Sequence, residues 1–335
     1  MKKKICVAMS GGVDSSFVAA YLLQNGFEVV GITMELFENQ NVAEDSKTVA
    51  DFLHIEHHIL DLRDDFQKYV VKKFVDEYNS ARTPNPCVNC NENIKFGRLF
   101  DFAMDLGADF FATGHYARIE NNQLKKSTNI EKDQSYFLYR IPRDRLSKIM
   151  FPLWNFSKEE VRRRAVEMNL PVAMKKDSQE ICFVPNDDYK SFLRSRVSFE
   201  AGKIVSTSGK ILGEHSGFMN YTIGQRRGLG ISHESPLYVV NLDSEKNSVV
   251  VGSNEELFSS ELIATDLKFL VDVPKKFRAD VKIRCSRRDS KATIEIENDL
   301  ARVKFDEPQR AITPGQSAVF YDSDLVLGGG FIRRF

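Results

Sequence analysis

An apolar run, a glycine-containing turn and a helical pattern follow one another at the start of the chain, and this order constrains the fold most. Ile5 to Met9 is apolar, Ser10-Gly11-Gly12-Val13-Asp14-Ser15-Ser16 follows, and a helical pattern runs from Asp14 to Gln24. Two adjacent glycines let a ligand approach the backbone, and hydroxyls beside the N–H groups that open a helix favour an anion. The segment predicts a buried strand, a loop for a phosphate chain, and a helix.

This loop is not a Walker A loop, because G-x-x-x-x-G-K-[ST] is missing from the sequence. A simpler interpretation is a plain strand, turn and helix in which Asp14 only opens the helix. Further along, apolar runs such as 28–34 and 109–112 alternate with helical patterns such as 14–24 and 65–78. Alternation of this kind predicts a parallel α/β sheet covered by helices on both faces.

The pattern of apolar and glycine residues changes twice after this region. We expect an α/β domain that contains the phosphate loop over residues 1–195, and glycines then divide residues 196–255 into short pieces, which predicts a small connecting domain. Short alternating strands such as 282–285, 293–297 and 318–321 predict a C-terminal β-barrel over residues 256–335.

Charge and composition exclude some classes of protein. The 335 residues carry 47 Lys and Arg and 47 Asp and Glu, so a polyanion would be bound by a local basic patch rather than by net charge. No apolar stretch approaches the roughly 18 residues of a membrane span, so no membrane partner is expected. Lys2-Lys3-Lys4 and the apolar run after it resemble a signal peptide, but the run is too short for one, so a cytoplasmic location is expected.

Cysteine chemistry is the second strong signal. Cys87 and Cys90 lie in Thr83-Pro84-Asn85-Pro86-Cys87-Val88-Asn89-Cys90-Asn91, which reads as a rigid loop before a helix over 94–104. A thiol near a helix N-terminus has a lowered pKa, so Cys90 is a candidate thiolate. Half of a zinc site is the alternative, but no second ligand pair of suitable spacing exists. Cys182 lies in a further loop, whereas Cys6 and Cys285 lie in strand patterns and are expected to be buried and inert.

Taken together, motifs spread over the whole chain resemble the tRNA-specific 2-thiouridylase (MnmA) family of PP-loop ATP pyrophosphatases. The motifs are 10–16, 83–91, Ala112-Thr113-Gly114-His115-Tyr116-Ala117, 132–138, the Cys182 loop over 176–185, Tyr221-Thr222-Ile223-Gly224-Gln225-Arg226-Arg227-Gly228-Leu229, 313–316 and 327–330. The resemblance implies that residues 1–195 form a PP-loop (adenine nucleotide α-hydrolase-like) ATP-binding catalytic domain and that the barrel over 256–335 contacts tRNA. It also implies ATP-dependent 2-thiolation of the wobble uridine of tRNA, which yields AMP and pyrophosphate.

The resemblance also implies roles for individual residues. Cys182 would carry a persulfide sulfur from a relay donor protein, Cys90 would be its partner in a disulfide, and Mg²⁺ would accompany ATP. The positions matched to ATP are Ala8, Met9, Ser10, Gly11, Gly12, Val13, Asp14, Ser15, Met34 and Gly114. The positions matched to tRNA are Asn85, Pro86, Cys87, His115, Lys132, Asp133, Gln134, Cys285, Ser286 and Gln316.

Two positions depart from the family pattern and leave alternatives open. Cys87 stands where many members have aspartate, so Cys87, Cys90 and Cys182 are also candidate ligands of a [4Fe-4S] cluster. Cys285 and Ser286 stand where the family has Tyr-Arg, so the phosphate contact either moves to Arg287 or Arg288 or is lost at a solvated face. Another PP-loop enzyme, one that adenylates and amidates its substrate, is a rival that would not need paired cysteines.

Overall fold

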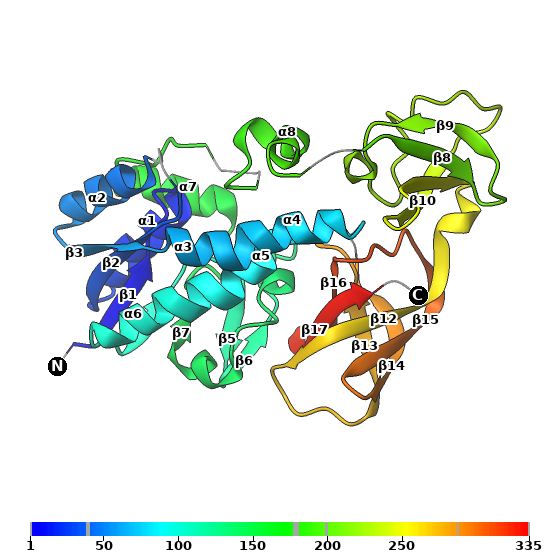
Figure 1. Cartoon of the computed structure of the whole chain (residues 1–335). Coiled ribbons are helices and arrows are strands. Elements are labelled where there is room, and N and C mark those ends of the chain that lie inside the picture. Colours follow the sequence, from blue (N-terminus) through cyan, green and yellow to red (C-terminus); the bar gives the residue numbers. More distant parts are fainter. Residues whose placement is uncertain (1, 38–40, 177–180, 198–199, 287, 334–335) are drawn as a thin grey trace.

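A parallel sheet forms the first part of the computed structural model, which describes residues 2–37, 41–176, 181–197, 200–286 and 288–333 (Figure 1). Its strand order is β3-β2-β1-β4-β7. The strands are β1 (Lys4–Ala8), β2 (Glu28–Glu35), β3 (Glu56–Asp61), β4 (Phe110–Ala112) and β7 (Ile149–Met150). Because β2 and β4 flank β1 on opposite sides, the chain reverses its winding direction there, and the loop after β1 lies at the opening where such sheets bind ligands.

Helices cover both faces of this sheet. Along β1, Ile5 and Val7 belong to one apolar cluster and Cys6 to another, so alternate side chains enter opposite layers. One layer contains α1 (Val13–Gln24), α2 (Val42–Leu53) and α7 (Lys158–Glu167). The other contains α3 (Arg63–Phe66), η1 (Gln67–Val71), α4 (Lys72–Asn79), α5 (Pro86–Asn89), η2 (Cys90–Leu99) and α6 (Phe100–Asp105). Burial on both faces explains why β1 is apolar without interruption.

The helix that contains the cysteines begins earlier than the sequence predicted. We expected a loop through Cys90 and a helix from Ile94, but α5 begins at Pro86 and continues through η2 and α6 to Asp105. Proline suits the first helical position because its fixed φ fits the helix and its missing N–H has no partner to lose there. Both Cys87 and Cys90 therefore lie in the first turns of one helix.

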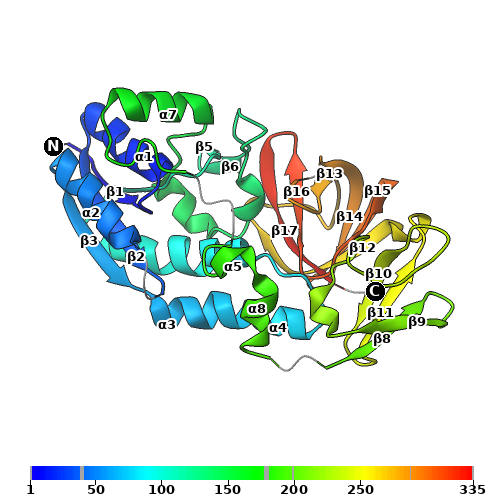
Figure 2. The ribbon, with the colours of Figure 1, turned by 90° about the horizontal axis from the view of Figure 1, so that it is seen from above.

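Two further sheets follow in the sequence (Figure 2). The first has the order β10-β11-β8-β9, with β8 (Gly202–Ser206), β9 (Ile211–His215), β10 (Tyr238–Asp243) and β11 (Ser248–Gly252). The second closes into a barrel because β12 pairs with both β15 and β17. Its strands are β12 (Phe258–Phe269), β13 (Lys276–Lys282), β14 (Ser290–Glu297), β15 (Leu300–Arg310), β16 (Ser317–Asp322) and β17 (Leu325–Arg333). The predicted fold class is confirmed, and the exact domain boundaries stay predictions.

Short segments complete the described chain. They are the hairpin β5 (Arg118–Glu120) and β6 (Gln123–Lys125), α8 (Tyr189–Arg194), and the short helices η3 (Ser135–Phe137), η4 (Arg143–Lys148), η5 (Pro185–Asp187), η6 (Phe218–Asn220) and η7 (Glu255–Leu257). The prediction of a strand over 282–285 was wrong beyond Lys282, where β13 ends, and Cys285 is exposed rather than buried. In the described residues, no helix combines the length and apolarity that a bilayer crossing requires.

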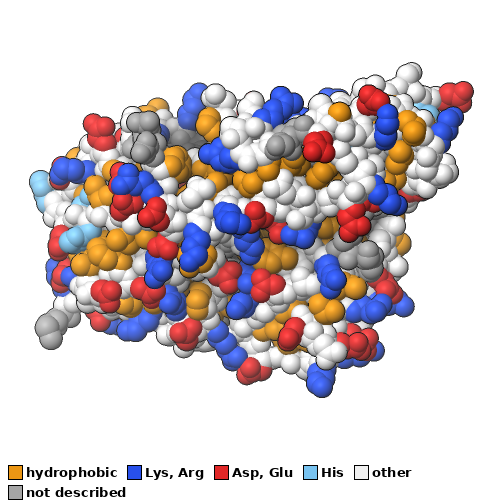
Figure 3. Space-filling view, viewed as in Figure 1, with side chains coloured by type: hydrophobic (Ala, Val, Ile, Leu, Met, Phe, Trp, Pro, Cys, Tyr) orange, Lys and Arg blue, Asp and Glu red, His pale blue; other side chains and the backbone are white. Residues whose placement is uncertain are grey.

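The barrel is bonded directly to the first part of the chain. β17 pairs with β6, the Tyr136 hydroxyl donates to the Ser317 carbonyl at 3.0 Å, and Arg140 Nη1 donates to the Asp266 carbonyl at 2.7 Å. Tyr136 is fully buried and Arg140 is 5% exposed, so these bonds are shielded from water. On the face in Figure 3, Lys and Arg lie interspersed with Asp and Glu, in keeping with the zero net charge.

Candidate active site

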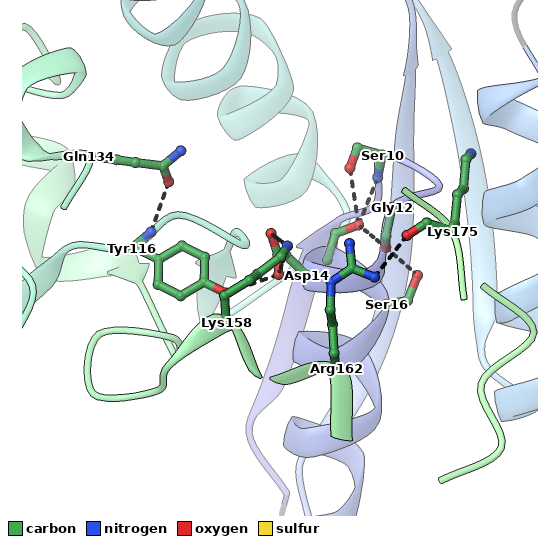
Figure 4. A network of polar contacts seen from close by, with 10 residues as sticks. Ser10, Gly12, Asp14, Ser16, Tyr116, Gln134, Lys158, Arg162 and Lys175 are labelled. Atoms are coloured by element: carbon green, nitrogen blue, oxygen red, sulfur yellow. Dashed lines mark hydrogen bonds and ion pairs between the residues drawn. The ribbon is translucent and has the colours of Figure 1, made fainter. Parts of the chain in front are cut away.

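The loop after β1 presents backbone N–H groups toward the opening of the sheet. Gly11 has φ +64°, and Gly12 precedes α1 without giving that helix a side-chain cap. Within the loop, the Ser10 N–H donates to Ser15 Oγ at 3.1 Å, and Ser16 Oγ donates to the Gly12 carbonyl at 2.8 Å (Figure 4). The first N–H groups of α1 therefore have no side-chain cap, an arrangement suited to an anion, and the binding of a phosphate chain there stays a prediction.

The other positions matched to ATP lie at the same edge. A Cβ added to Gly114 would lie 3.1 Å from the Ser15 nitrogen and 3.2 Å from Asp14 Cβ, so the segment after β4 packs against the start of α1. Met34 is half-buried near the end of β2. Carboxyl ends of parallel strands meet at one edge, which explains why these distant residues gather around the loop. Their contact with ATP stays a prediction.

Sequence reasoning missed the cations that border the loop. Lys158 Nζ lies 2.7 Å from both carboxylate oxygens of Asp14, and the Tyr116 hydroxyl donates to Asp14 Oδ1 at 3.0 Å. Lys175 Nζ donates to the Gly11 carbonyl at 3.0 Å and pairs with Asp45. Lys158 is the first residue of α7, where the helix dipole disfavours a cation. That unfavourable placement is the one signal in the sequence that marks Lys158 as a site residue.

Asp14 is also connected to the segment matched to tRNA. The Tyr116 N–H donates to Gln134 Oε1 at 2.9 Å, and the Gln134 N–H donates to the Tyr116 carbonyl at 2.8 Å. Since the Tyr116 hydroxyl donates to Asp14, a single tyrosine joins Gln134 to the phosphate loop. Asp133 is 7% exposed and accepts from the Ser127 N–H at 2.9 Å and the Ser135 hydroxyl at 2.7 Å, so it stabilises this segment internally. Lys132 is exposed.

The fold brings three cysteines together. Cys182 and Cys87 both lie close enough to Cys90 to raise its pKa by charge repulsion, although Cys182 lies far along the chain. Phe183, beside Cys182, packs at right angles against Phe74 with 5.2 Å between ring centroids, which anchors the Cys182 loop in the same apolar layer as Cys90. Cys90 is 8% exposed, whereas Cys87 and Cys182 are exposed to solvent. Residues 177–180, before Cys182, lie outside the described part of the chain.

The resting thiols are protonated at neutral pH, contrary to the sequence expectation for Cys90. Burial raises the pKa of Cys90 to about 12, against the lowering effect of Lys95. Cys182 reaches solvent, but the residues packed around its sulfur remove enough hydration to raise the pKa of Cys182 to about 11. The helix N-terminus was the basis of our expectation, but the loss of hydration of a buried thiolate outweighs it. In the described residues, no group of three His, Cys, Asp or Glu side chains is arranged to bind a metal ion.

The remaining positions matched to tRNA differ in their surroundings. Asn85 and Pro86 lie at the start of α5, and Gln316 reaches this segment from the barrel, donating from Nε2 to the Thr83 and Pro84 carbonyls at 2.8 and 3.2 Å. His115 Nδ1 lies 2.7 Å from Thr113 Oγ1. Cys285 and Ser286 are exposed after β13. Arg287 lies outside the described residues, and Arg288 is exposed. Their contacts with RNA stay predictions.

Comparison with known proteins agrees with this arrangement. Three family models match in order: a tRNA methyl transferase HUP domain over residues 3–186, a tRNA methyl transferase PRC-barrel domain over 190–253, and an aminomethyltransferase β-barrel domain over 259–332. The chain is 46% identical to the tRNA-specific 2-thiouridylase MnmA of Caldicellulosiruptor saccharolyticus, over 100% of this chain and 99% of the relative. It is 48% identical to that of Syntrophomonas wolfei, over 98% and 99%.

The chain belongs to the tRNA-specific 2-thiouridylase family. A third relative, from Clostridioides difficile, is 44% identical over 100% of this chain and 99% of its own length. Since these similarities extend over all three sheets, the thiouridylase family accounts for the barrel and the connecting sheet as well as for the phosphate loop.

Gly11 provides a direct test of the phosphate loop of this thiouridylase. A Cβ at position 11 would lie 2.9 Å from Asp45 Cβ, and φ is +64°, so Gly11→Ala adds both strain and a clash. We expect about 1–3 kcal/mol of destabilisation and a raised KM for ATP. Gly26→Ala is the matched control because Gly26 has φ +84° with nothing within 4 Å of the added Cβ. Thermal unfolding and pyrophosphate release measure the two effects, and an unchanged KM for ATP would contradict the prediction.

Gln316 provides a test of how the barrel acts on the cysteine segment. The Thr83 N–H donates to the Pro314 carbonyl at 2.9 Å, so together with the two bonds from Gln316 the barrel holds the backbone just before Asn85. We expect Gln316→Ala to lower kcat for thiolation about 10-fold. This corresponds to the loss of about 1–1.5 kcal/mol from the hydrogen bonds that hold the segment in place. Gln309→Ala is the control because, among the described residues, the half-buried Gln309 side chain makes hydrogen bonds only within the barrel, with Ser290 and Glu307. A rise in KM for tRNA with unchanged kcat would instead assign Gln316 to RNA binding alone.

Proposed function

We propose that this protein uses ATP to replace the C2 oxygen of the wobble uridine of tRNA with sulfur, giving 2-thiouridine, AMP and pyrophosphate. One observation carries the proposal: Cys90 and the loop of Cys182, which are remote in sequence, pack in one apolar layer that covers the sheet whose edge carries the glycine loop after β1. Relatives at 44–48% identity over the full chain carry the name of this activity. Two of the family models are described as tRNA methyl transferase domains, but the thiols and the glycine loop of this site favour thiolation.

The first half of the reaction needs a good leaving group at C2. The uridine oxygen attacks the α-phosphorus of ATP, a P–O bond breaks, and pyrophosphate leaves with the electron pair. The loop N–H groups, Lys158 and Lys175 would bind the phosphate chain. When bound, Mg²⁺ would neutralise charge on the departing phosphates, and Asp14 and Asp45 are the carboxylates beside the loop that would hold it directly or through water.

The second half needs both thiols. The terminal sulfur of a persulfide on Cys182 attacks C2, and the Cys90 thiolate then attacks the Cys182 sulfur. The sulfur–sulfur bond of the adduct breaks, its electron pair goes to the sulfur on C2, and AMP leaves as C2=S forms. The Cys90–Cys182 disulfide that results must be reduced by a dithiol, and the persulfide must be renewed by a donor protein, before the next turnover.

Nucleoside mass spectrometry tests the proposed function. In tRNA from cells that lack this protein we expect 2-thiouridine derivatives to disappear and to return when the protein is restored. Retention of these nucleosides would overturn the proposal. A cluster-dependent route through Cys87, Cys90 and Cys182 predicts iron and acid-labile sulfide in anaerobically purified protein, and activity in their absence eliminates it.

A further inference from the structure

Lys95 lies one π-helical turn after Cys90. Both belong to η2, the π-helical stretch Cys90–Leu99, in which backbone hydrogen bonds link residues five apart. In an α-helix, by contrast, residues three and four apart share a face. The π-helical winding therefore turns Lys95 toward the side of the helix on which Cys90 lies. π-helical segments of this kind occur frequently at functional sites.

His115 holds the Lys95 ammonium group. Lys95 Nζ lies 3.4 Å from His115 Nε2, and His115 Nδ1 lies 2.7 Å from Thr113 Oγ1. The imidazole packs against Phe96 and Phe151 with ring centroids 5.8 and 5.9 Å away. Burial, with a contribution from Lys95, holds the pKa of His115 well below its usual value, so the ring is neutral and its Nε2 accepts from Lys95.

The π-helical register places Lys95 near the side of η2 that carries Cys90, and its ammonium group contacts a neutral imidazole rather than a carboxylate. Among the ion pairs of the described residues, none joins Lys95 to Asp or Glu. Lys95 acts on Cys87, Cys90 and Cys182 alike, in each case favouring the thiolate. The other charged or titratable groups that act on these three thiols are the thiols themselves, and Cys285 is influenced in turn by Cys87, Lys282 and Asp133. Because the Lys95 ammonium group is not paired with a carboxylate in the described residues, it is suited to stabilise a thiolate that forms nearby.

We propose that Lys95, held by His115, supplies the charge that stabilises the sulfur anions formed at Cys90 and Cys182. This inference rests on the proposed function, because it assumes that both sulfurs ionise during turnover. Cys90 releases its proton to solvent, and the thiolate near Lys95 attacks the Cys182 sulfur, so that one sulfur–sulfur bond forms as another breaks. His115 acts as a positioning residue through Lys95.

The test measures the ionisation of the thiols directly, without turnover. The rate at which iodoacetamide modifies Cys90 and Cys182 is measured at about pH 8 by peptide mass spectrometry in Lys95→Met, Lys95→Gln and Lys95→Arg. At this pH the rate is proportional to the small fraction of each thiol that is ionised. We expect both rates to fall about 10-fold in the Met and Gln variants, as for thiol pKa values about one unit higher, and to return in Lys95→Arg. Lys72→Met is the control, since Lys72 pairs with Asp76 on the surface. His115→Asn should give a smaller fall.

Turnover measurements separate this inference from its alternatives. The Met and Gln variants should lose about 10-fold in kcat for thiolation, which corresponds to a one-unit change in thiol ionisation, and retain pyrophosphate release. Unchanged alkylation rates would overturn the inference, and so would a parallel loss of pyrophosphate release, which would assign Lys95 to the adenylate phosphate. Failure of the proposed function is distinguishable, because 2-thiouridine would then persist in cells that lack the protein whatever the alkylation rates of the thiols are.

Discussion

Replacing Lys158 with methionine is expected to reduce pyrophosphate release about 10²- to 10³-fold, the loss typical of removing one preorganised charge from a transition state. The loop has no lysine of the Walker A type, and Lys158 reaches it from α7 to lie 2.7 Å from both oxygens of Asp14. As the phosphate chain enters, this ammonium group is positioned to bind it. tRNA-dependent release of pyrophosphate measures the effect.

A control separates phosphate binding from simple destabilisation of the fold. The Lys158 side chain is 10% exposed, so its ion pair with Asp14 is largely shielded from water. Lys158→Met removes that cation and leaves the Asp14 carboxylate with the hydrogen bond from Tyr116. The double variant Asp14→Asn with Lys158→Met removes that imbalance, and we expect it to recover thermal stability. Asp14→Asn alone is measured beside it because Asp14 is also a proposed Mg²⁺ ligand, and we expect the double variant to release pyrophosphate more slowly than this single variant. Equal release by these two variants would show that Lys158 only neutralises Asp14.

Replacing Cys90 with serine is expected to lower 2-thiouridine formation by at least about 10³-fold. The two thiols act in one step, so removing either one removes the whole sulfur transfer. Pyrophosphate release should continue, since Cys90 does not contribute to the adenylation step. Cys182→Ser should give the same pattern. After one turnover of the unaltered protein, peptide mass spectrometry should detect a disulfide between Cys90 and Cys182.

Cys6→Ala is the matched control for these two variants. Cys6 is a fully buried thiol in β1, on the same face of the sheet as Cys90 but within the strand rather than at the site. We expect thiolation within about twofold of the unaltered protein, because only a small packing loss is involved. Thiolation that persists in Cys90→Ser would contradict paired thiol chemistry and would equally contradict a cluster that needs Cys90 as a ligand.

Local pattern predicted the order of elements in the first part of the chain correctly. The run from Ile5 to Met9 became β1, the pattern after Gly12 became α1, and the run from Glu28 became β2. Such predictions succeed because apolar periodicity reports which faces of one segment are buried. The start of the cysteine helix was wrong by eight residues, from Ile94 to Pro86, because a proline was taken as a loop residue although it also suits the first helical position.

The environment of the cysteines could not be predicted in the same way. A helix N-terminus is visible in a sequence and suggests a lowered pKa for Cys90, but the apolar layer that encloses the thiol is assembled from α4, η1 and the Cys182 loop. That desolvation raises the pKa of Cys90 to about 12. Similarly, Cys285 was expected in a strand, whereas β13 ends at Lys282 and leaves it exposed.

The sequence alone determined the α/β order, the position of the phosphate loop and the identity of the thiols, because each depends on residues that are neighbours in the chain. Only the tertiary structure decided which charges act on them. Lys158 meets Asp14 across 144 positions, and Gln316 reaches Thr83 across 233. The physical reason is that hydration and Coulomb interactions depend on distance in space, which packing sets and sequence separation does not.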